Sequence, residues 1–193
     1  MTRPSRRPRR VAVLLLLALT ATATLFGMTR LRHFVFPSPV TWDEVRWQIA
    51  ENFPSVPQLG TTELAAMLGD PAGPRPLLID TRAAREYAVS HLPGALHAEM
   101  IEDVRRLLAT APRDQAVVLY CSVGWRSSRL AADLLQADPA RSVHNLDGSL
   151  FQWANEGRPL VTPDGTPTHR AHPYDQRWGR LLDARLHAEN PRP

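Results

Sequence analysis

Short apolar runs alternate with stretches of helical periodicity through the middle of this chain, and this alternation constrains its fold more than any other feature. The runs at 77–80, 116–120 and 143–146 have the length of buried strands. Strands that alternate with crossover helices form a mainly parallel sheet with helices on both faces. The pattern therefore predicts a three-layer α/β domain over residues 56–161, with helices at 62–68, 83–89, 100–108, 127–136 and 150–155.

Two segments flank this domain. Residues 33–55 are interpreted as a spacer and an amphipathic helix that Thr41 caps, with apolar side chains at three- and four-residue steps at Trp42, Val45, Ile49 and Phe53. Residues 162–193 form a Pro-rich tail without a clear strand. The tail is interpreted either as flexible or as packed on the domain through one short helix with Trp178, Leu181, Leu182 and Leu186.

Residues 1–32 are interpreted as a basic N-terminus with a membrane-targeting segment. Five arginines precede residues 11–28, an uncharged run just long enough to cross a hydrocarbon core of about 30 Å. The positive-inside rule then places the domain on the extracytoplasmic, periplasmic side of a bacterial membrane. An uncleaved transmembrane anchor is favoured, and the alternative is a signal peptide cleaved near Ala21-Thr22-Ala23, which would give a secreted protein.

Composition excludes several classes of function. All 23 basic residues are arginine, and seven precede His33, so the rest of the chain has no excess of positive charge with which to hold nucleic acid. One cysteine can form neither an internal disulfide nor a cysteine-based zinc site. The dinucleotide-binding pattern G-x-G-x-x-G is absent, and no cofactor or metal is expected.

The single cysteine, Cys121, ends an apolar strand and begins a loop that leads into a predicted helix. In a parallel sheet, ligands bind at the carboxyl ends of the strands. Loop amides that curl around one point, together with a helix N-terminus, form a cradle for an anion, and Gly124 permits the tight curl. Such a cradle would lower the pKa of the thiol, so Cys121 is the candidate nucleophile.

Three ordered blocks of sequence accompany this cysteine. The first is the loop Cys-x-x-Gly-x-Arg-Ser itself. The second is Asp80-Thr81-Arg82, Glu86-Tyr87 and His91-Leu92-Pro93-Gly94-Ala95, and the third is Asn145-Leu146-Asp147-Gly148-Ser149, Trp153 and Gly157-Arg158-Pro159-Leu160. Over residues 56–161 they resemble the rhodanese family of sulfurtransferases. Ser149 stands where that family often has glycine, a departure that concerns the local turn.

The resemblance implies a sulfurtransferase without a cofactor. In that scheme Cys121 attacks the outer sulfur of a small anionic donor such as thiosulfate and holds the atom as a persulfide, which a thiol, cyanide or a protein acceptor removes. Six loop residues from cysteine to arginine resemble the sulfurtransferases, whereas related phosphatases and arsenate reductases carry one more. The expected substrate-binding residues are Arg82, Ser122, Val123, Gly124, Trp125, Arg126 and Ser127.

Charged residues near the cysteine leave alternatives open. Arg126 either turns toward the loop or pairs outward with an acid of its helix. Asp80 either accepts hydrogen bonds from loop amides, as structural support of the site, or caps the next helix. Arg82 and Glu86 are spaced for an ion pair on one helix.

Other polar and aromatic residues are given lesser roles. His91 precedes a Pro-Gly turn and is interpreted as structural, and Trp125 is expected to project from the rim of the loop. His169 and His172 are interpreted as solvated tail residues. The alternative function is a rhodanese-like module that binds a protein or relays sulfur with little turnover of its own.

Overall fold

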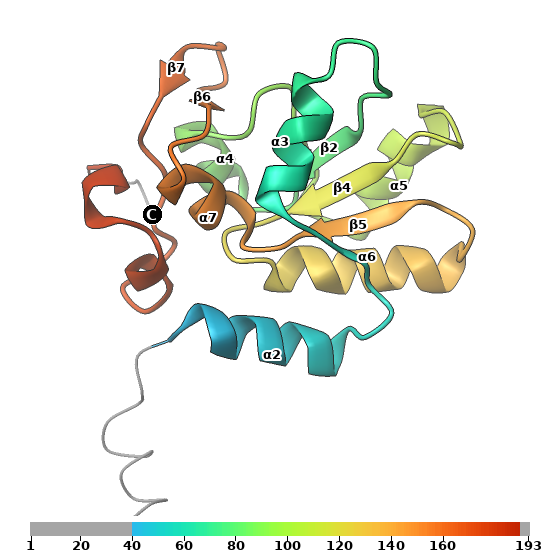
Figure 1. Ribbon diagram of the computed structural model, residues 1–193, viewed down its shortest axis with the longest axis horizontal. Helices are drawn as coiled ribbons and strands as arrows, with labels where there is room; N and C mark the ends of the chain where they lie inside the picture. The colour runs from blue at the N-terminus through green and yellow to red at the C-terminus, as the bar shows by residue number, and fades with distance from the viewer. Residues whose placement is uncertain (1–39, 190–193) are drawn as a thin grey trace, which may run out of the picture. The chain divides into compact units, whose positions relative to one another are not determined.

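The structure, a computed structural model, describes residues 40–189 (Figure 1). The predicted membrane segment at 11–28 and the predicted cleavage site at residues 21–23 lie outside these residues, so both stay predictions. Between residues 40 and 189, no helix combines the length and the apolar composition that crossing a membrane requires.

A five-stranded sheet forms the centre of the domain, and every neighbouring pair of strands is parallel (Figure 1). The strands lie in the order β1-β5-β4-β2-β3. Their bounds are β1 Gln58–Leu59, β2 Leu77–Asp80, β3 Leu96–His97, β4 Val117–Tyr120 and β5 Val143–Leu146. The prediction of an α/β fold with a mainly parallel sheet is confirmed.

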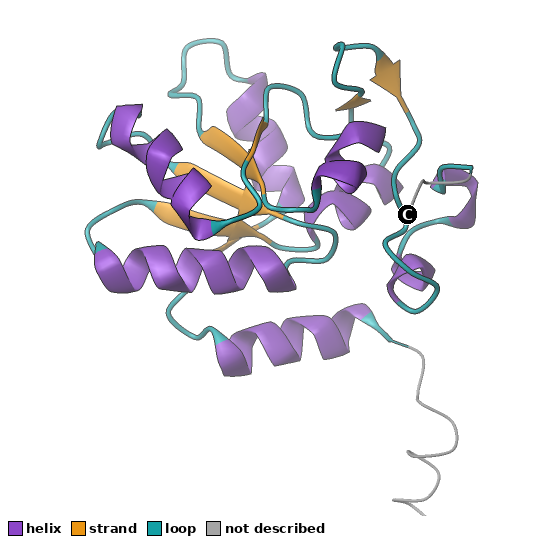
Figure 2. Ribbon diagram, turned by 180° about the vertical axis from the view of Figure 1, so that it is seen from behind, coloured by secondary structure: helices purple, strands orange, loops and turns teal. Residues whose placement is uncertain are grey.

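Five helices flank this sheet, and a sixth, α2 Trp42–Asn52, lies on the outer side of α6 Trp125–Ala137 (Figure 2). The other four are α3 Thr61–Gly69, α4 Ala84–Val89, α5 Ile101–Thr110 and α7 Ser149–Asn155. Each predicted helix is present, with its ends displaced by at most two residues. The Thr41 hydroxyl accepts a hydrogen bond from the Glu44 amide at 3.2 Å, so the predicted cap of α2 is also present.

Alternate residues of β4 face two different cores. Val118 and Tyr120 belong to a cluster that includes buried side chains of α3 and α7. Val117 and Leu119 belong to a second cluster with α5 and α6. All four side chains are buried, because a strand covered by helices on both faces has no solvent side. This burial is why the segment reads as a continuous apolar run.

The structure adds two short strands and corrects one helix start. β1 and β3 contain two residues each, and runs that short carry no periodicity from which to predict them. α6 begins at Trp125, two residues before its predicted start, because Gly124 adopts a left-handed conformation that lets the helix follow the loop at once.

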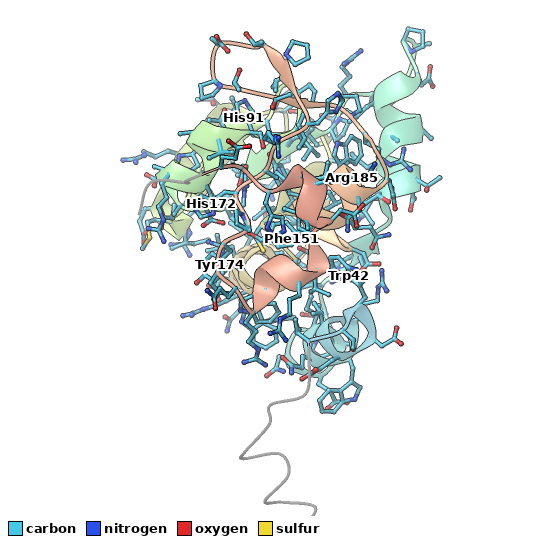
Figure 3. All side chains as sticks on the ribbon, turned by 90° about the vertical axis from the view of Figure 1, so that its left-hand side faces the viewer. Trp42, His91, Phe151, His172, Tyr174 and Arg185 are labelled. Atoms are coloured by element: carbon cyan, nitrogen blue, oxygen red, sulfur yellow. The ribbon has the colours of Figure 1, made fainter. Side chains whose placement is uncertain are left out.

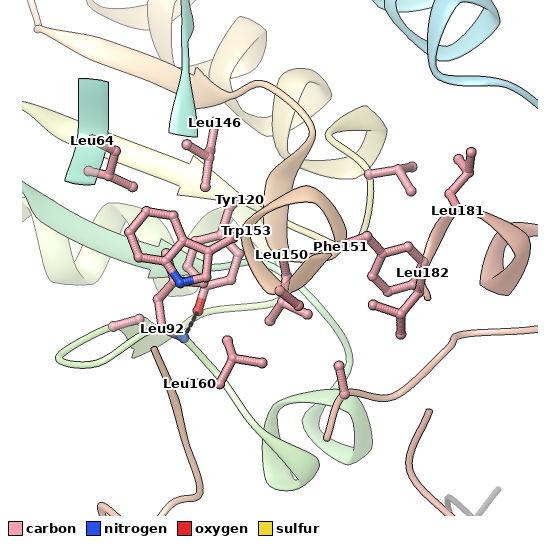
Figure 4. Packing of buried hydrophobic residues seen from close by; sticks show 14 of the residues in the cluster. Leu64, Leu92, Tyr120, Leu146, Leu150, Phe151, Trp153, Leu160, Leu181 and Leu182 are labelled. Carbon is pink, nitrogen blue, oxygen red and sulfur yellow. Dashed lines mark hydrogen bonds between the residues drawn. The ribbon is translucent and has the colours of Figure 1, made fainter. Parts of the chain in front are cut away.

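The tail follows the packed alternative rather than the flexible one. Its strand β7 Pro167–Thr168 pairs antiparallel with β6 Leu160–Val161 at the end of the domain. Two 3-10 helices, Trp178–Leu181 and Ala184–Leu186, stand in place of the one expected helix. Leu181, Leu182 and Leu186 are buried in the same cluster as Phe151 of α7 (Figure 4). Burial of each leucine is worth about 2 kcal/mol and helps to hold the tail on the domain.

Candidate active site

β4 places Cys121 at the centre of the carboxyl edge of the sheet, between β2 and β5. Three residues then separate the cysteine from α6. Gly124 has a φ of 105°, and a Cβ atom there would lie 3.1 Å from Asn145 Nδ2 and 3.2 Å from Ile49 Cδ1. The left-handed backbone favours glycine at this position, and a Cβ atom there would also contact two side-chain ends tightly.

The loop backbone is tied to the first turn of α7. The amides of Leu150 and Phe151 donate to the carbonyl oxygens of Cys121 and Ser122 at 3.1 and 3.0 Å. The Cys121 amide donates to Ser149 Oγ at 3.2 Å. Ser149 holds a left-handed φ of 49°, at the position where the sequence departs from glycine. The serine thus adds an acceptor that holds the amide of the candidate nucleophile.

The Cys121 thiol is 1% exposed, and its sulfur accepts a hydrogen bond from the Gly124 amide at 3.2 Å. Burial raises the pKa of this thiol. The positive charge of Arg126, together with hydrogen bonds from Ser127 and the Val123 amide, outweighs burial and leaves the pKa below its ordinary value. The loop therefore favours the thiolate, the form of cysteine that acts as a nucleophile.

Arg126 turns toward the loop and also pairs with an acid, but that acid lies on α4 rather than on its own helix. Its two terminal nitrogens contact the two carboxylate oxygens of Glu86 at 2.7 and 2.8 Å, and Nη2 donates to Ser122 Oγ at 3.0 Å. The Ser122 hydroxyl donates to Glu86 at 3.0 Å. Burial alone would raise the pKa of Glu86, yet its bonds to Arg126 lower it, so the carboxylate stays charged.

Arg82 does not line the pocket, and the expectation that it binds substrate is wrong. Its side chain is fully buried and makes a two-pronged pair with Asp80, with Nε–Oδ1 and Nη2–Oδ2 distances of 2.9 and 2.7 Å. Arg82 also donates to the carbonyl oxygen of Ser90. The expected ion pair with Glu86 on one helix is replaced by this pair, because Arg82 lies before α4 begins.

Asp80 binds Arg82 and not the Cys121 loop, so its expected role as structural support of the site stays a prediction. Its carboxylate accepts the backbone amide and the side chain of Arg82, rather than amides of the Cys121 loop. Asp80 and Arg82 join the end of β2, next to β4, to the segment that follows α4.

The remaining histidines and Trp125 lie in different surroundings. His91 stacks on Tyr87 with ring centroids 3.9 Å apart, in agreement with a structural role. Trp125 lies at the pocket, where it meets Phe53 edge-on at 5.1 Å. His169 is exposed, but His172 is only 4% exposed and its Nδ1 accepts the Tyr174 amide, so the interpretation of His172 as solvated is wrong.

A pocket of about 100 Å³ opens beside the cysteine. Two segments line it, the Cys121 loop and the tail. The lining residues are Cys121, Ser122, Val123, Trp125, Arg126, Tyr174 and Trp178. Figure 3 views this face, with His172 and Tyr174 of the tail next to each other. Two of the expected substrate-binding residues, Gly124 and Ser127, do not line the pocket. Both hydrogen-bond to the Cys121 sulfur, and the Ser127 hydroxyl also donates to Asn145 Oδ1 at 2.6 Å.

Four residues of the site were not assigned to it from the sequence. Glu86 stands 40 positions from its partner Arg126, and Ser149 was treated as a turn residue. Tyr174 and Trp178 lie in a tail without periodicity. The block Glu86-Tyr87 was a signal for the first of these, because it belongs to the second of the sequence blocks that accompany Cys121.

Comparison with known proteins agrees with this geometry. A family model, the Rhodanese-like domain, matches residues 61–156. A sulfurtransferase of Allochromatium vinosum is 39% identical over 90 residues, which cover 46% of this chain and 81% of that protein. A probable adenylyltransferase/sulfurtransferase of Mycobacterium tuberculosis is 34% identical over 89 residues, but these are only 22% of its length.

A solved structure is similar in fold. The thiosulfate sulfurtransferase from Pseudomonas aeruginosa aligns with a TM-score of 0.55 and 21% identity, over 72% of this chain and 26% of that chain. The site is a single cysteine in a curled loop, at the end of the central strand of an α/β domain. The chain belongs to the rhodanese-like family.

Proposed function

We propose that this protein is a sulfurtransferase that carries sulfur as a persulfide on Cys121. One observation carries the proposal: the only sulfhydryl group of the chain accepts a loop amide, has a lowered pKa and lies at a pocket. A thiolate in that position can attack a sulfur atom, and the same amide and cation stabilise the persulfide anion between the two half-reactions.

The proposed donor is thiosulfate. The Cys121 thiolate attacks its outer sulfur, so a bond forms between Sγ and that sulfur. The sulfur–sulfur bond of thiosulfate breaks, and its electron pair leaves on sulfite. In the second half-reaction, the carbon of cyanide or the sulfur of a thiolate attacks the terminal persulfide sulfur, and Cys121 departs as a thiolate. The sum needs no external oxidant or reductant, because the sulfur is transferred as a neutral atom and the electron pair of each broken bond stays on the group that leaves.

Arg126 and Glu86 divide the electrostatic task. The Arg126 guanidinium faces both the thiol and the pocket, where it stabilises the negative charge of donor and persulfide. Glu86 holds that guanidinium through two hydrogen bonds and thereby fixes its direction.

Intact mass spectrometry tests the proposal. The full chain incubated with thiosulfate should gain one sulfur atom, and cyanide should remove it as thiocyanate. The Cys121→Ser variant should gain none, whereas Trp47→Ala, on the exposed side of α2, should behave as the wild type. A wild-type chain that gains no sulfur would contradict the proposal and favour the binding or relay module. Phosphate release from an aryl phosphate that depends on Cys121 would favour a hydrolase.

The proposal extends to the cellular side on which the site works. Five arginines before the uncharged run at 11–28 support a membrane-anchored protein with its domain on the extracytoplasmic side. Protease added to intact spheroplasts should then degrade the domain. Protection of the domain until the membrane is opened would contradict this orientation.

A further inference from the structure

The pocket is completed by residues that lie outside the family match. The match ends at residue 156, whereas Tyr174 and Trp178 line the pocket from the tail. They lie opposite a loop whose own lining residues come from the family motif. One side of the pocket is therefore built by the motif, and the other by a segment that belongs to this chain.

Tyr174 is held at the pocket in a conformation that its residue type disfavours. Its φ is 67°, which costs a residue with a side chain about 1 kcal/mol. Its amide donates to Nδ1 of buried His172 at 2.9 Å. The ring lies over the Arg126 guanidinium, with 4.9 Å from Arg126 Cζ to the ring centroid. The surrounding contacts thus hold the ring on the cation of the site despite the backbone strain.

Trp178 is held by the packing of the tail on α7. The Trp178 amide donates to Asp175 Oδ1 at 2.8 Å, which begins the short helix. Asn155 of α7 fixes the end of that helix twice, because its Nδ2 donates to the Leu181 carbonyl and its Oδ1 accepts the Asp183 amide, both at 2.8 Å. The indole is therefore part of a fixed wall and not of a free chain end.

We propose that Tyr174 and Trp178 are specificity-determining residues that restrict Cys121 to small reactants. The sulfur is 1% exposed, the pocket holds about 100 Å³, and the two aromatic side chains occupy the side from which a larger reactant would approach. A small inorganic anion or a short thiol fits this space. A thiol on a large, rigid body meets the tail first. The selection among sulfur donors and acceptors rests on the proposed function, whereas the limit on the size of a reactant that reaches Cys121 does not.

Alkylation of Cys121 tests the wall without any sulfur chemistry. The full chain has one cysteine, so each adduct reports this thiol alone. The rate with a bulky aromatic maleimide is divided by the rate with iodoacetamide, and the ratio cancels changes in the thiolate fraction because both reagents use the same thiolate. Tyr174→Gly and Trp178→Ala should each raise the ratio about tenfold, the effect of removing about 1.4 kcal/mol of steric cost.

Matched variants separate the wall from general damage. Tyr174→Gly is expected to fold, because glycine accepts the φ of 67° without strain. Tyr174→Phe retains the ring and should leave the ratio at the wild-type value, as should Trp47→Ala on α2. An unchanged ratio in both Tyr174→Gly and Trp178→Ala would overturn the inference.

A second arm follows the proposed reaction. Cys121 loaded with thiosulfate is discharged with cyanide or with glutathione, and the two wall variants should raise the glutathione rate relative to the cyanide rate. Equal ratios in wild type and variants would contradict the inference for sulfur transfer. If the wild type takes up no sulfur, the proposed function fails, and the alkylation ratio still decides whether the wall restricts access.

Discussion

Two arginine–carboxylate pairs lie near the carboxyl edge of the sheet, and they differ in what they can do. Arg82 and Asp80 are two residues apart, and both side chains are 0% exposed. Arg126 and Glu86 are 40 residues apart, and the Arg126 side chain is 34% exposed while Glu86 is 0% exposed. The first pair is closed to ligands, whereas the second presents its cation to the pocket and to the thiol.

A charged residue in a family motif can therefore serve the fold or the chemistry, and the exposure of the cation distinguishes the two. Burial of an ion pair costs desolvation free energy, and here each pair joins two elements of the fold. Arg82–Asp80 joins the end of β2 to the segment after α4. Arg126–Glu86 joins α4 to the Cys121 loop, so it both positions the loop and charges the pocket.

Loss of the closed pair should have the largest effect on stability. Arg82→Met leaves the Asp80 carboxylate buried without its partner, and we expect the free energy of unfolding to fall by about 3–5 kcal/mol. Urea denaturation measures it. Arg46→Met, which breaks the half-exposed pair with Asp147, is the control and should cost less than about 1 kcal/mol. An Arg82→Met variant as stable as Arg46→Met would show that the buried pair is no more important for stability than the half-exposed one.

Loss of the open pair should affect reactivity as well as stability. Arg126→Met removes the charge that lowers the thiol pKa, so the pKa should rise and alkylation of Cys121 at neutral pH should slow about tenfold for each unit of that rise. The same variant leaves Glu86 buried and unpaired. The double variant Arg126→Met, Glu86→Gln should recover stability but not reactivity. Recovery of both would show that the charge acts through folding alone.

A smaller effect should appear in the acid range. The folded-state pKa of Glu86 lies below its ordinary value of 4.5, so the pair contributes stability that is complete above about 4.5 and is lost as the pH falls through the folded-state pKa. Unfolding free energies measured from pH 6 downward should fall less steeply in Glu86→Gln than in the wild type. Parallel curves would mean that Glu86 has no such role.

Much of the fold could be predicted because it depends on local patterns. β2, β5 and the helices follow from apolar runs and their spacing, and the position of Cys121 at a strand end follows from the same pattern. Gly124 was predicted to permit a tight curl of the loop, and its backbone is left-handed. These features are determined by residues that are close together in the sequence.

The parts that escaped prediction depend on distant contacts. The motif block marks Glu86 as a residue of interest but does not name Arg126 as its partner, and the four-residue spacing of Arg82 and Glu86 suggested a different pair. Tyr174 and Trp178 reach the pocket because buried leucines of the tail pack on α7. The sequence offered a packed tail as one of two alternatives, but its local pattern does not say where on the domain the tail lies. Local propensity therefore located the nucleophile, whereas tertiary packing determined its surroundings.

The pH dependence of Cys121 alkylation shows whether the loop stabilises the thiolate. The rate with iodoacetamide, followed by intact mass on the full chain, should rise with pH and level off as the thiol ionises. The lowered pKa predicts a midpoint below the ordinary value of 9.0. A midpoint at or above 9.0 would contradict the account, because the loop would then bury the thiol without stabilising its anion.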